Sequence, residues 1–375
     1  MTRKIEAAAN NAAASRAAGH LKNLRGQIDK LDLQILKIIN ERASVAAEIG
    51  KLKNDHGAEV FSPAREEEVL ENVLQANKGP LDVAILRAIF REIMSGSRAL
   101  QKVLKVAFLG PEYSYSHLAA VERFGQAVEF MGVGSIAAVF EEVNRGHADF
   151  GVVPLENSTD GRVADTLDMF IRLPQLKVCA EVRMRIHHNL LANCEQQEIR
   201  RIYSKPQALS QCRNWLAKNV PYASLHEVAS TATAAELAQR ERGAAAVASR
   251  QAAVRYGLRI LFPDIEDEAN NETRFAIIGL QETAKTGNDK TAVMFRLPHE
   301  PGSLVDALNI FKQNKLNLTW IESFPARGAG QEYVFFVDFE GHSDDPKVKR
   351  CLAALEEHCE AVTVLGSYPM AKVSG

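Results

Sequence analysis

The chain has 375 residues and a net charge of −2, so it is long enough for two or three domains that each bury a core. Because it contains no basic tract, the sequence excludes an electrostatic site for nucleic acid or for an acidic membrane surface. Its five cysteines show no CxxC or histidine-paired spacing, which indicates a reducing compartment and argues against a metal site.

The first 20 residues are rich in alanine but are interrupted by polar residues, so they lack the apolar core of a signal peptide. No apolar run long enough to span a membrane follows them. We therefore expect a cytoplasmic protein without a membrane segment, and a flexible N-terminal extension over residues 1–20.

A long amphipathic helix is predicted from Leu21 to about Asn54. Apolar residues recur there at steps of three and four on one face, and a stripe of this length needs a partner helix. Arg42 occupies one position of the stripe, and Lys53 lies three turns further on nearly the same face, roughly 16 Å away. A cation in an apolar stripe needs an anionic partner. The residues alone leave two interpretations of Arg42 open, an internal pair with a glutamate and a clamp for an anionic ligand.

Two further helices are predicted before residue 102. Ser62 and Pro63 have the residue types of an N-cap and of a first helical position, so they begin the second helix. Residues 81–101 form the third, with Ser97 and Gln101 one turn apart. Three helices of such unequal length bury the stripe poorly in a monomer. We therefore expect a dimer in which two long helices pack together.

The pattern changes at Val103, where short apolar runs begin to alternate with helical segments. This βαβ rhythm predicts an α/β domain with a mostly parallel sheet and with ligands at the carboxyl ends of the strands. The expected strands are residues 105–109, 128–133, 150–155 and 201–204. The expected helices are residues 136–143, 207–216 and 231–239.

The C-terminal part has a different element order. A polar segment over residues 282–290 predicts a linker. After it, strand and helix patterns follow in the order βαββαβ, which is typical of an α+β ferredoxin-like fold. The predicted domains are the helical residues 21–102, the α/β residues 104–281 and the ferredoxin-like residues 291–370.

This layout and its motifs resemble the bifunctional chorismate mutase and prephenate dehydratase family over nearly the whole chain from Leu21 to Tyr368. The resemblance implies an all-helical mutase, an intertwined dimer, that converts chorismate to prephenate without a cofactor. The rearrangement needs a compact substrate conformer and stabilisation of charge on the breaking ether oxygen. In the family Lys53 and Gln101 match the donors to that oxygen and Glu66 matches the acceptor of the ring hydroxyl. The matching site positions are Arg25 (which reaches the partner's site), Arg42, Lys53, Arg65, Glu66, Ser97 and Gln101.

Residues 104–281 resemble the dehydratase of this family, whose two α/β lobes flank a cleft as in periplasmic binding proteins. The run Thr273-Arg274-Phe275 is its most specific motif. The resemblance implies that Thr273 donates a hydrogen bond to the departing hydroxyl of prephenate, while Phe275 could supply an apolar niche for the carboxylate that leaves. The implied substrate-binding residues are Asn157, Ser158, Thr159, Ser204, Gln211, Arg274 and Phe275.

The last domain resembles the ACT regulatory module, which binds amino acids at dimer interfaces. Residues 301–305 match its glycine turn into a helix, and residues 321–325 match its second motif, except that Phe324 replaces a frequent arginine. The resemblance implies phenylalanine, the end product, as an inhibitor. The implied effector-binding residues are Gly302, Ser303, Leu304, Val305, Glu322 and Ser323.

The residues leave two alternatives to a bifunctional enzyme open. In one, only the dehydratase is active and the helical domain serves dimerisation, which the intact set of mutase residues argues against. In the other, the chain is a non-catalytic amino-acid sensor, which would have no need of Thr273-Arg274-Phe275.

Overall fold

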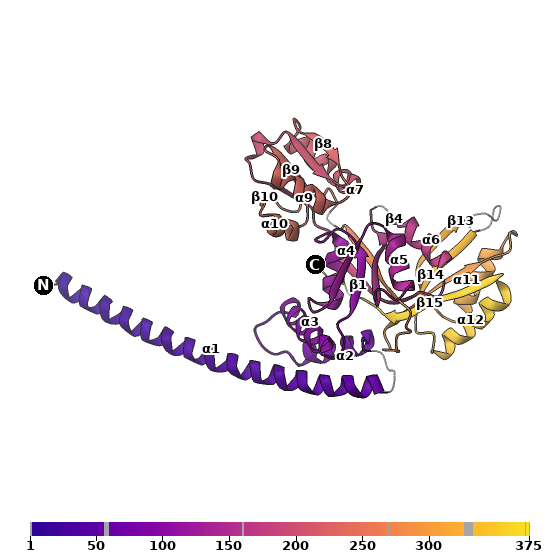
Figure 1. Ribbon diagram of the computed structural model, residues 1–375, viewed down its shortest axis with the longest axis horizontal. Helices are drawn as coiled ribbons and strands as arrows, with labels where there is room; N and C mark the ends of the chain where they lie inside the picture. The colour runs from indigo at the N-terminus through magenta and orange to yellow at the C-terminus, as the bar shows by residue number, and fades with distance from the viewer. Residues whose placement is uncertain are drawn as a thin grey trace. The chain divides into compact units, whose positions relative to one another are not determined.

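A computed structural model of the protein (Figure 1) describes residues 2–55, 60–159, 161–268, 270–325, 333–371 and 373–374. Gly57, where the long helix was expected to end, lies outside these ranges. The chain divides into two compact units, residues 1–60 with 96–102 and residues 61–95 with 103–375. Within the described ranges, none of the helices combines the length and the apolar character that crossing a membrane requires.

Helix α1 spans Thr2–Asp55. The expectation that residues 1–20 lie outside the helix is therefore corrected, since alanine, the strongest helix former, dominates this stretch and no proline interrupts it. The predicted apolar stripe is exposed to solvent along α1, with fractions of 42% for Leu24, 54% for Ile35 and 62% for Leu52.

Two helices follow, α2 (Pro63–Ala76) and α3 (Val83–Ala99). The predicted start of α2 is confirmed, because Ser62 is the N-cap and its hydroxyl accepts a hydrogen bond from the backbone N–H of Arg65. At the end of α3 in the second unit, the hydroxyl of Ser95 accepts from the backbone N–H of Ala127, 3.1 Å away.

The first α/β lobe is built on a seven-stranded sheet of order β16-β5-β11-β3-β1-β2, with β4 paired to β3. Strand β1 runs parallel to β2 and β3, whereas β11 is antiparallel to β3 and β5. Its helices are α4 (Tyr115–Phe124), α5 (Ile136–Asn144) and α6 (Ala164–Arg172). Its strands are β1 (Lys105–Leu109), β2 (Glu129–Val133), β3 (Phe150–Asn157), β4 (Gly161–Arg162), β5 (Lys177–Arg185), β11 (Glu272–Gly279) and β16 (Val373–Ser374).

The second lobe is a five-stranded sheet of order β10-β6-β9-β7-β8. Its strands are β6 (Asn189–Ala192), β7 (Arg201–Ser204), β8 (Ser224–Glu227), β9 (Ala244–Ala248) and β10 (Arg259–Phe262). Its helices are α7 (Pro206–Gln211), α8 (Arg213–Asn219), α9 (Thr231–Arg240), α10 (Arg250–Tyr256) and the short 3-10 helix η1 (Gln196–Glu198).

Both sheets are mixed, which corrects the expectation of a mostly parallel sheet. The chain enters the second lobe after β5 and returns to the first lobe at β11, and β5 and β11 are antiparallel neighbours. The spacing of apolar residues identifies strands but does not encode this pairing between distant segments.

The C-terminal domain confirms the predicted βαββαβ order, with sheet order β13-β14-β12-β15. Its first strand begins at Asp289, inside the predicted linker. Along this strand Val293 and Phe295 pack against the two helices, which lie beside the sheet in Figure 1, while Ala292 and Met294 join a core shared with the first lobe. The elements are β12 (Asp289–Arg296), α11 (Ser303–Gln313), β13 (Leu318–Pro325), β14 (Tyr333–Glu340), α12 (Pro346–His358) and β15 (Ala361–Pro369).

The C-terminal sheet packs closely on the first lobe where β15 passes β5. Gly366 has φ 147°, and a Cβ at this position would lie 2.3 Å from the carbonyl oxygen of Val178. Nearby, Lys177 Nζ donates a hydrogen bond to the carbonyl oxygen of Val364 over 2.6 Å. The C-terminal domain is thus held to the first lobe by packing, not only by the chain that joins them.

Candidate functional site

A cluster of amide and hydroxyl side chains lies where β3 ends and β11 begins. Asn157 Nδ2 donates to Thr273 Oγ1 over 2.8 Å and to Asn271 Oδ1 over 2.9 Å. The hydroxyl of Thr159 donates to the same Asn271 oxygen, and Asn271 Nδ2 donates to Gln211 Oε1 of α7 in the second lobe over 2.8 Å. We call Asn157, Thr159, Gln211, Asn271 and Thr273 the amide–hydroxyl cluster.

Strand pairing explains how the sequence builds this cluster. Thr273 is the cross-strand partner of Asn157 in the antiparallel pair of β11 and β3, which brings their side chains together. Directly after Asn157, the backbone N–H of Thr159 donates to Asn157 Oδ1 over 3.0 Å and closes an Asx turn. Ser158 has a structural part here, since its hydroxyl accepts from Glu272 N and donates to Asn270 O.

Two members of the site were missed from the sequence. Asn271 bonds to three members of the cluster, and its position inside the Asn-Glu-Thr-Arg-Phe run was the signal that could have revealed it. His188 is 2% exposed, and its Nε2 lies 2.9 Å from Gln211 Oε1. Because an amide oxygen can only accept a hydrogen bond, the ring proton of His188 is assigned to Nε2. The carboxylate of Glu266 accepts from the His188 backbone N–H and fixes this segment.

A cavity of about 290 Å³ opens beside the cluster, at the lower end of the range for small-molecule sites. The carboxylate of Asp267 in its wall accepts from the backbone N–H groups of Asn214 and Trp215 at the start of α8, so it is held in place. The lining residues are Thr159, Ser210, Gln211, Asp267, Glu268 and Asn271.

Besides Ser158, the structure leaves three of the expected substrate-binding residues outside this cluster. Ser204 is fully buried and donates to the carbonyl oxygen of Val247 over 2.6 Å. Phe275 is 2% exposed and belongs to the apolar core of the first lobe. Arg274 is 6% exposed, and its guanidinium is bound to carboxylates on the other side of the sheet from Thr273.

In the helical unit, two of the residues predicted for the mutase site are in direct contact. Arg42 Nη1 donates to Ser97 Oγ over 2.7 Å. Gly50 packs against Gln101, and a Cβ on Gly50 would lie 2.4 Å from Gln101 Cγ. The buried Gln101 Oε1 has no hydrogen-bond partner among the described residues. Lys53 Nζ donates to the carbonyl oxygen of Val60, while Arg25 is exposed.

Arg65 and Glu66 belong to the other unit. Arg65 is exposed and its guanidinium lies 2.7 Å from the carboxylate of Glu68 one turn on. Glu66 Oε2 lies 3.4 Å from Arg123 Nη1 on α4 of the first α/β lobe, with both side chains largely buried. Glu66, the expected acceptor of the substrate hydroxyl, therefore also joins α2 to the first lobe.

The expected effector-binding residues lie on two elements of the C-terminal domain. Gly302 has φ 95° and is the N-cap of α11, which Ser303, Leu304 and Val305 begin. Glu322 and Ser323 lie on β13, where the Glu322 carboxylate pairs with Arg162 of β4 over 2.9 Å. Phe324 is 7% exposed and belongs to the core that this domain shares with the first lobe.

The fold and its polar cluster define a class of protein, a two-lobed α/β enzyme preceded by a helical domain and followed by a ferredoxin-like regulatory domain. The match to known families agrees in all three parts. Chorismate mutase type II matches residues 24–102, prephenate dehydratase matches residues 106–283 and the ACT domain matches residues 291–357.

Relatives of full length identify the particular family. A bifunctional chorismate mutase/prephenate dehydratase of Aquifex aeolicus is 42% identical over 94% of this chain and 98% of its own length. The protein of that name from Stutzerimonas stutzeri is 44% identical over 94% of this chain and 99% of its own length. The chain belongs to the bifunctional chorismate mutase/prephenate dehydratase family.

A solved structure supports the assignment of the second and third domains. The crystal structure of prephenate dehydratase from Arthrobacter aurescens in complex with L-Phe is 31% identical, with a TM-score of 0.66. It covers 72% of this chain and 90% of its own.

Proposed function

We propose that this chain carries out both reactions of its family, the rearrangement of chorismate to prephenate and the conversion of prephenate to phenylpyruvate. The observation that carries the second reaction is the amide–hydroxyl cluster, in which Asn157 Nδ2 donates to Thr273 Oγ1. The first is supported by Arg42, Ser97 and Gln101 in the helical unit.

In the dehydratase reaction the bond between the ring and a carboxylate breaks and CO₂ leaves. The electron pair of that bond makes the ring aromatic, and the ring C–O bond breaks with its electrons on the departing hydroxide, which takes a proton and leaves as water. A hydroxide is a poor leaving group, so a donor has to assist it. Because Asn157 already donates to the Thr273 oxygen, the Thr273 hydroxyl acts as a donor toward substrate.

The other cluster members bind the substrate in this proposal. Thr159, Gln211 and Asn271 offer hydroxyl and amide donors beside the cavity, and such neutral donors can hold carboxylates. Ser158 fixes the turn that carries Thr159, whereas Ser204 and Phe275 support the fold behind the site. Desolvation in a closed cleft would favour the loss of CO₂.

In the mutase reaction no proton is transferred, so the residues have to hold a compact conformer and stabilise the ether oxygen. Arg42 suits a carboxylate of chorismate, because guanidinium groups bind carboxylates in bidentate fashion. Lys53 and Gln101 are assigned to the ether oxygen, Ser97 holds Arg42, and the partner's copy of Arg25 completes the site.

We also propose that the protein is at least a dimer and works in the cytoplasm. The dimer is supported by the exposed apolar stripe of α1, which a second long helix would cover. The location is supported by the cysteines, which form no disulfide among the described residues. Phenylalanine is the proposed effector, bound by the N-terminus of α11 and by Glu322 and Ser323.

One assay tests the proposed function directly. Purified protein is given chorismate, and the loss of chorismate is followed separately from the appearance of phenylpyruvate, with and without phenylalanine. We expect both signals, with phenylpyruvate formation slowed by phenylalanine. Accumulation of prephenate alone would refute the dehydratase assignment, and a rate insensitive to phenylalanine would refute the effector assignment.

A further inference from the structure

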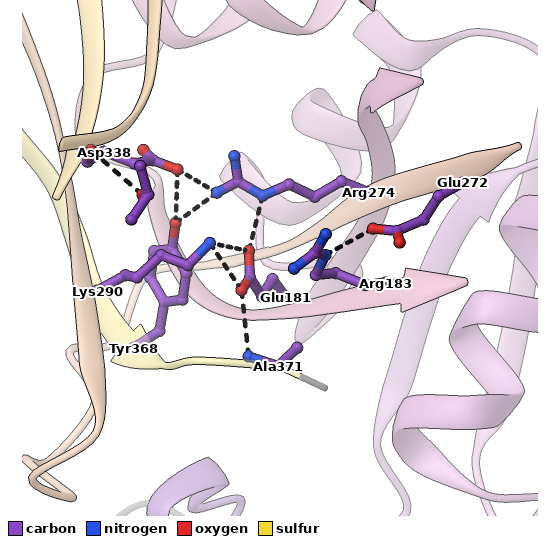
Figure 2. A network of polar contacts seen from close by, with 9 residues as sticks. Glu181, Arg183, Glu272, Arg274, Lys290, Asp338, Tyr368 and Ala371 are labelled. Carbon is purple, nitrogen blue, oxygen red and sulfur yellow. Dashed lines mark hydrogen bonds and ion pairs between the residues drawn. The ribbon is translucent and has the colours of Figure 1, made fainter. Parts of the chain in front are cut away.

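A buried network of charges joins the seven-stranded sheet of the first lobe to the C-terminal domain (Figure 2). Arg274 Nε donates to Glu181 Oε2 over 2.7 Å, and its Nη2 donates to Tyr368 Oη over 2.8 Å and to the carboxylate of Asp338. Lys290 Nζ lies 3.0 Å from Glu181 Oε1. All four charged side chains are at most 8% exposed.

Each domain contributes one cation and one anion, and two of the ion pairs, Arg274 with Asp338 and Lys290 with Glu181, cross between the domains. Arg274 and Glu181 lie on β11 and β5 of the first lobe, whereas Asp338 and Lys290 lie on β14 and β12 of the C-terminal domain. Buried charges are tolerated when they are paired and hydrogen-bonded. The position of the Arg274 guanidinium is therefore fixed in part by the C-terminal domain.

Arg274 is the chain neighbour of Thr273, the proposed hydrogen-bond donor to the departing hydroxyl. Thr273 and Arg274 are consecutive residues of β11 and point to opposite faces of the sheet. The pairing of β11 with β3 shifts register between Arg274 and Phe275. A bulge beside a site sets the direction of the neighbouring side chains, so a displacement of Arg274 would turn Thr273 relative to Asn157.

The same arginine lies close to the effector motif. The Arg274 guanidinium lies 5.6 Å from the centre of the Trp320 ring, and Trp320 is the cross-strand partner of Asp338. Glu322, a proposed effector contact, lies two residues further on the same strand. A ligand that moves β13 would thus reach Arg274 through Trp320 and Asp338.

From these contacts we propose that Arg274 is a positioning residue through which the C-terminal domain controls the placement of Thr273. Arg274 does not touch substrate in this arrangement, which revises its expected binding role. The inference rests on the proposed dehydratase function, and it adds the route by which an effector bound to the C-terminal domain alters that activity.

The test compares variants on the C-terminal side of the network. Tyr368→Phe removes one hydrogen bond to Arg274 without changing charge, and Asp338→Asn removes the carboxylate. We expect both to lower dehydratase kcat about tenfold or more, since small misplacements of reacting groups are costly, with little change in KM. We also expect the phenylalanine concentration for half inhibition to rise about fivefold or more. The mutase rate of each variant should stay at the wild-type value.

The matched control is Lys177→Met. It removes a 2.6 Å hydrogen bond across the same domain interface, from Lys177 to Val364, without touching the network. Arg274→Lys is the conservative variant and should recover part of the kcat lost in Arg274→Gln. If Tyr368→Phe and Asp338→Asn match Lys177→Met in kcat and in phenylalanine response, the proposal is overturned.

Misfolding of a variant and failure of the proposed function can both be distinguished from failure of the positioning role. Tyr368→Phe is the decisive variant if Asp338→Asn does not fold, because it leaves the buried charges balanced. Wild-type protein that forms no phenylpyruvate would mean that the proposed function itself has failed. Active wild-type protein with unaltered Tyr368→Phe kinetics would mean that only the positioning role has failed.

Discussion

The side-chain nitrogen of Asn157 lies 2.8 Å from the hydroxyl oxygen of Thr273 and donates to it. This direction of the hydrogen bond matters for the proposed chemistry. Asn157→Asp keeps the shape of the side chain but replaces the donor with an acceptor, so the Thr273 proton would turn toward the new carboxylate. We expect the dehydratase kcat to fall by about 10²-fold or more, a loss typical of one preorganised donor.

The measurement is phenylpyruvate formation from prephenate, with the mutase rate of the same sample as an internal reference. Thr273→Ala should abolish dehydration, and Thr273→Ser, which keeps the hydroxyl, should retain part of it. A fully active Asn157→Asp variant would show that the hydroxyl does not act as the donor.

Gly50 provides a separate test of the mutase site. A Cβ at this position would lie 2.4 Å from Gln101 Cγ and 2.9 Å from Gln101 Cβ, so Gly50→Ala has to displace the Gln101 side chain. Because alanine favours the helix over glycine by about 1 kcal/mol, the helix itself should not suffer. We expect the mutase kcat to fall about 10²-fold, while the dehydratase rate stays unchanged.

Gly19→Ala is the control, because a Cβ at Gly19 meets nothing within 4 Å. It should have wild-type activity in both reactions. Equal mutase rates for the Gly50 and Gly19 variants would show that Gln101 has no part in the mutase reaction.

The sequence predicted the elements well where local chemistry decides them. The Ser62-Pro63 helix start and the strand over residues 105–109 agree with the structure, because capping and apolar spacing are local properties. It did not predict that the sheets are mixed or that Arg274 binds Asp338, because these depend on pairing between segments far apart in the chain. Ser204 was expected at the substrate, but nothing local reveals that its hydroxyl is satisfied by Val247.

The exposed stripe of α1 gives a test of the proposed dimer. Ile35 is 54% exposed in the single chain, and Ile35→Asp would place a charge in the proposed interface, where an unpaired buried charge is unfavourable. We expect a lower mass in sedimentation velocity and loss of mutase activity. Lys37→Asp, which lies off the stripe, should remain dimeric and active. A wild-type protein that sediments as an active monomer would contradict the dimer.

Gly366 tests the close packing of the C-terminal domain on β5. Alanine there would have to adopt φ 147° and would place its Cβ 2.3 Å from Val178 O. We expect Gly366→Ala to lower the free energy of unfolding by more than about 2 kcal/mol, from backbone strain together with the clash. Gly287→Ala separates the two causes, because Gly287 has φ 94° but no atom within 4 Å of an added Cβ. It should cost only about 1 kcal/mol, measured by urea unfolding, and equal losses would rule out the clash.

His117 should make the stability of the first lobe depend on pH. Its Nδ1 accepts from the backbone N–H of Tyr113 over 3.0 Å, and the side chain is buried. Burial lowers the pKa of His117 below its ordinary value of 6.5, against a smaller opposite effect of Glu112. The folded protein therefore binds this proton less readily than the unfolded chain. The contribution of neutral His117 to the free energy of unfolding is fully present above pH 6.5, the ordinary pKa of histidine. It is lost as the pH falls through the pKa of His117 in the folded protein.

The variant His117→Asn offers a neutral oxygen near the position of Nδ1 and cannot take up a proton in this range. We expect the wild-type melting temperature to fall between about pH 7.5 and about pH 5.5 by more than that of the variant. Thermal unfolding followed by circular dichroism at these two pH values measures the difference. Parallel losses in both proteins would assign the acid sensitivity to other groups, and a smaller loss in the wild type would reverse the sign of the proposed linkage.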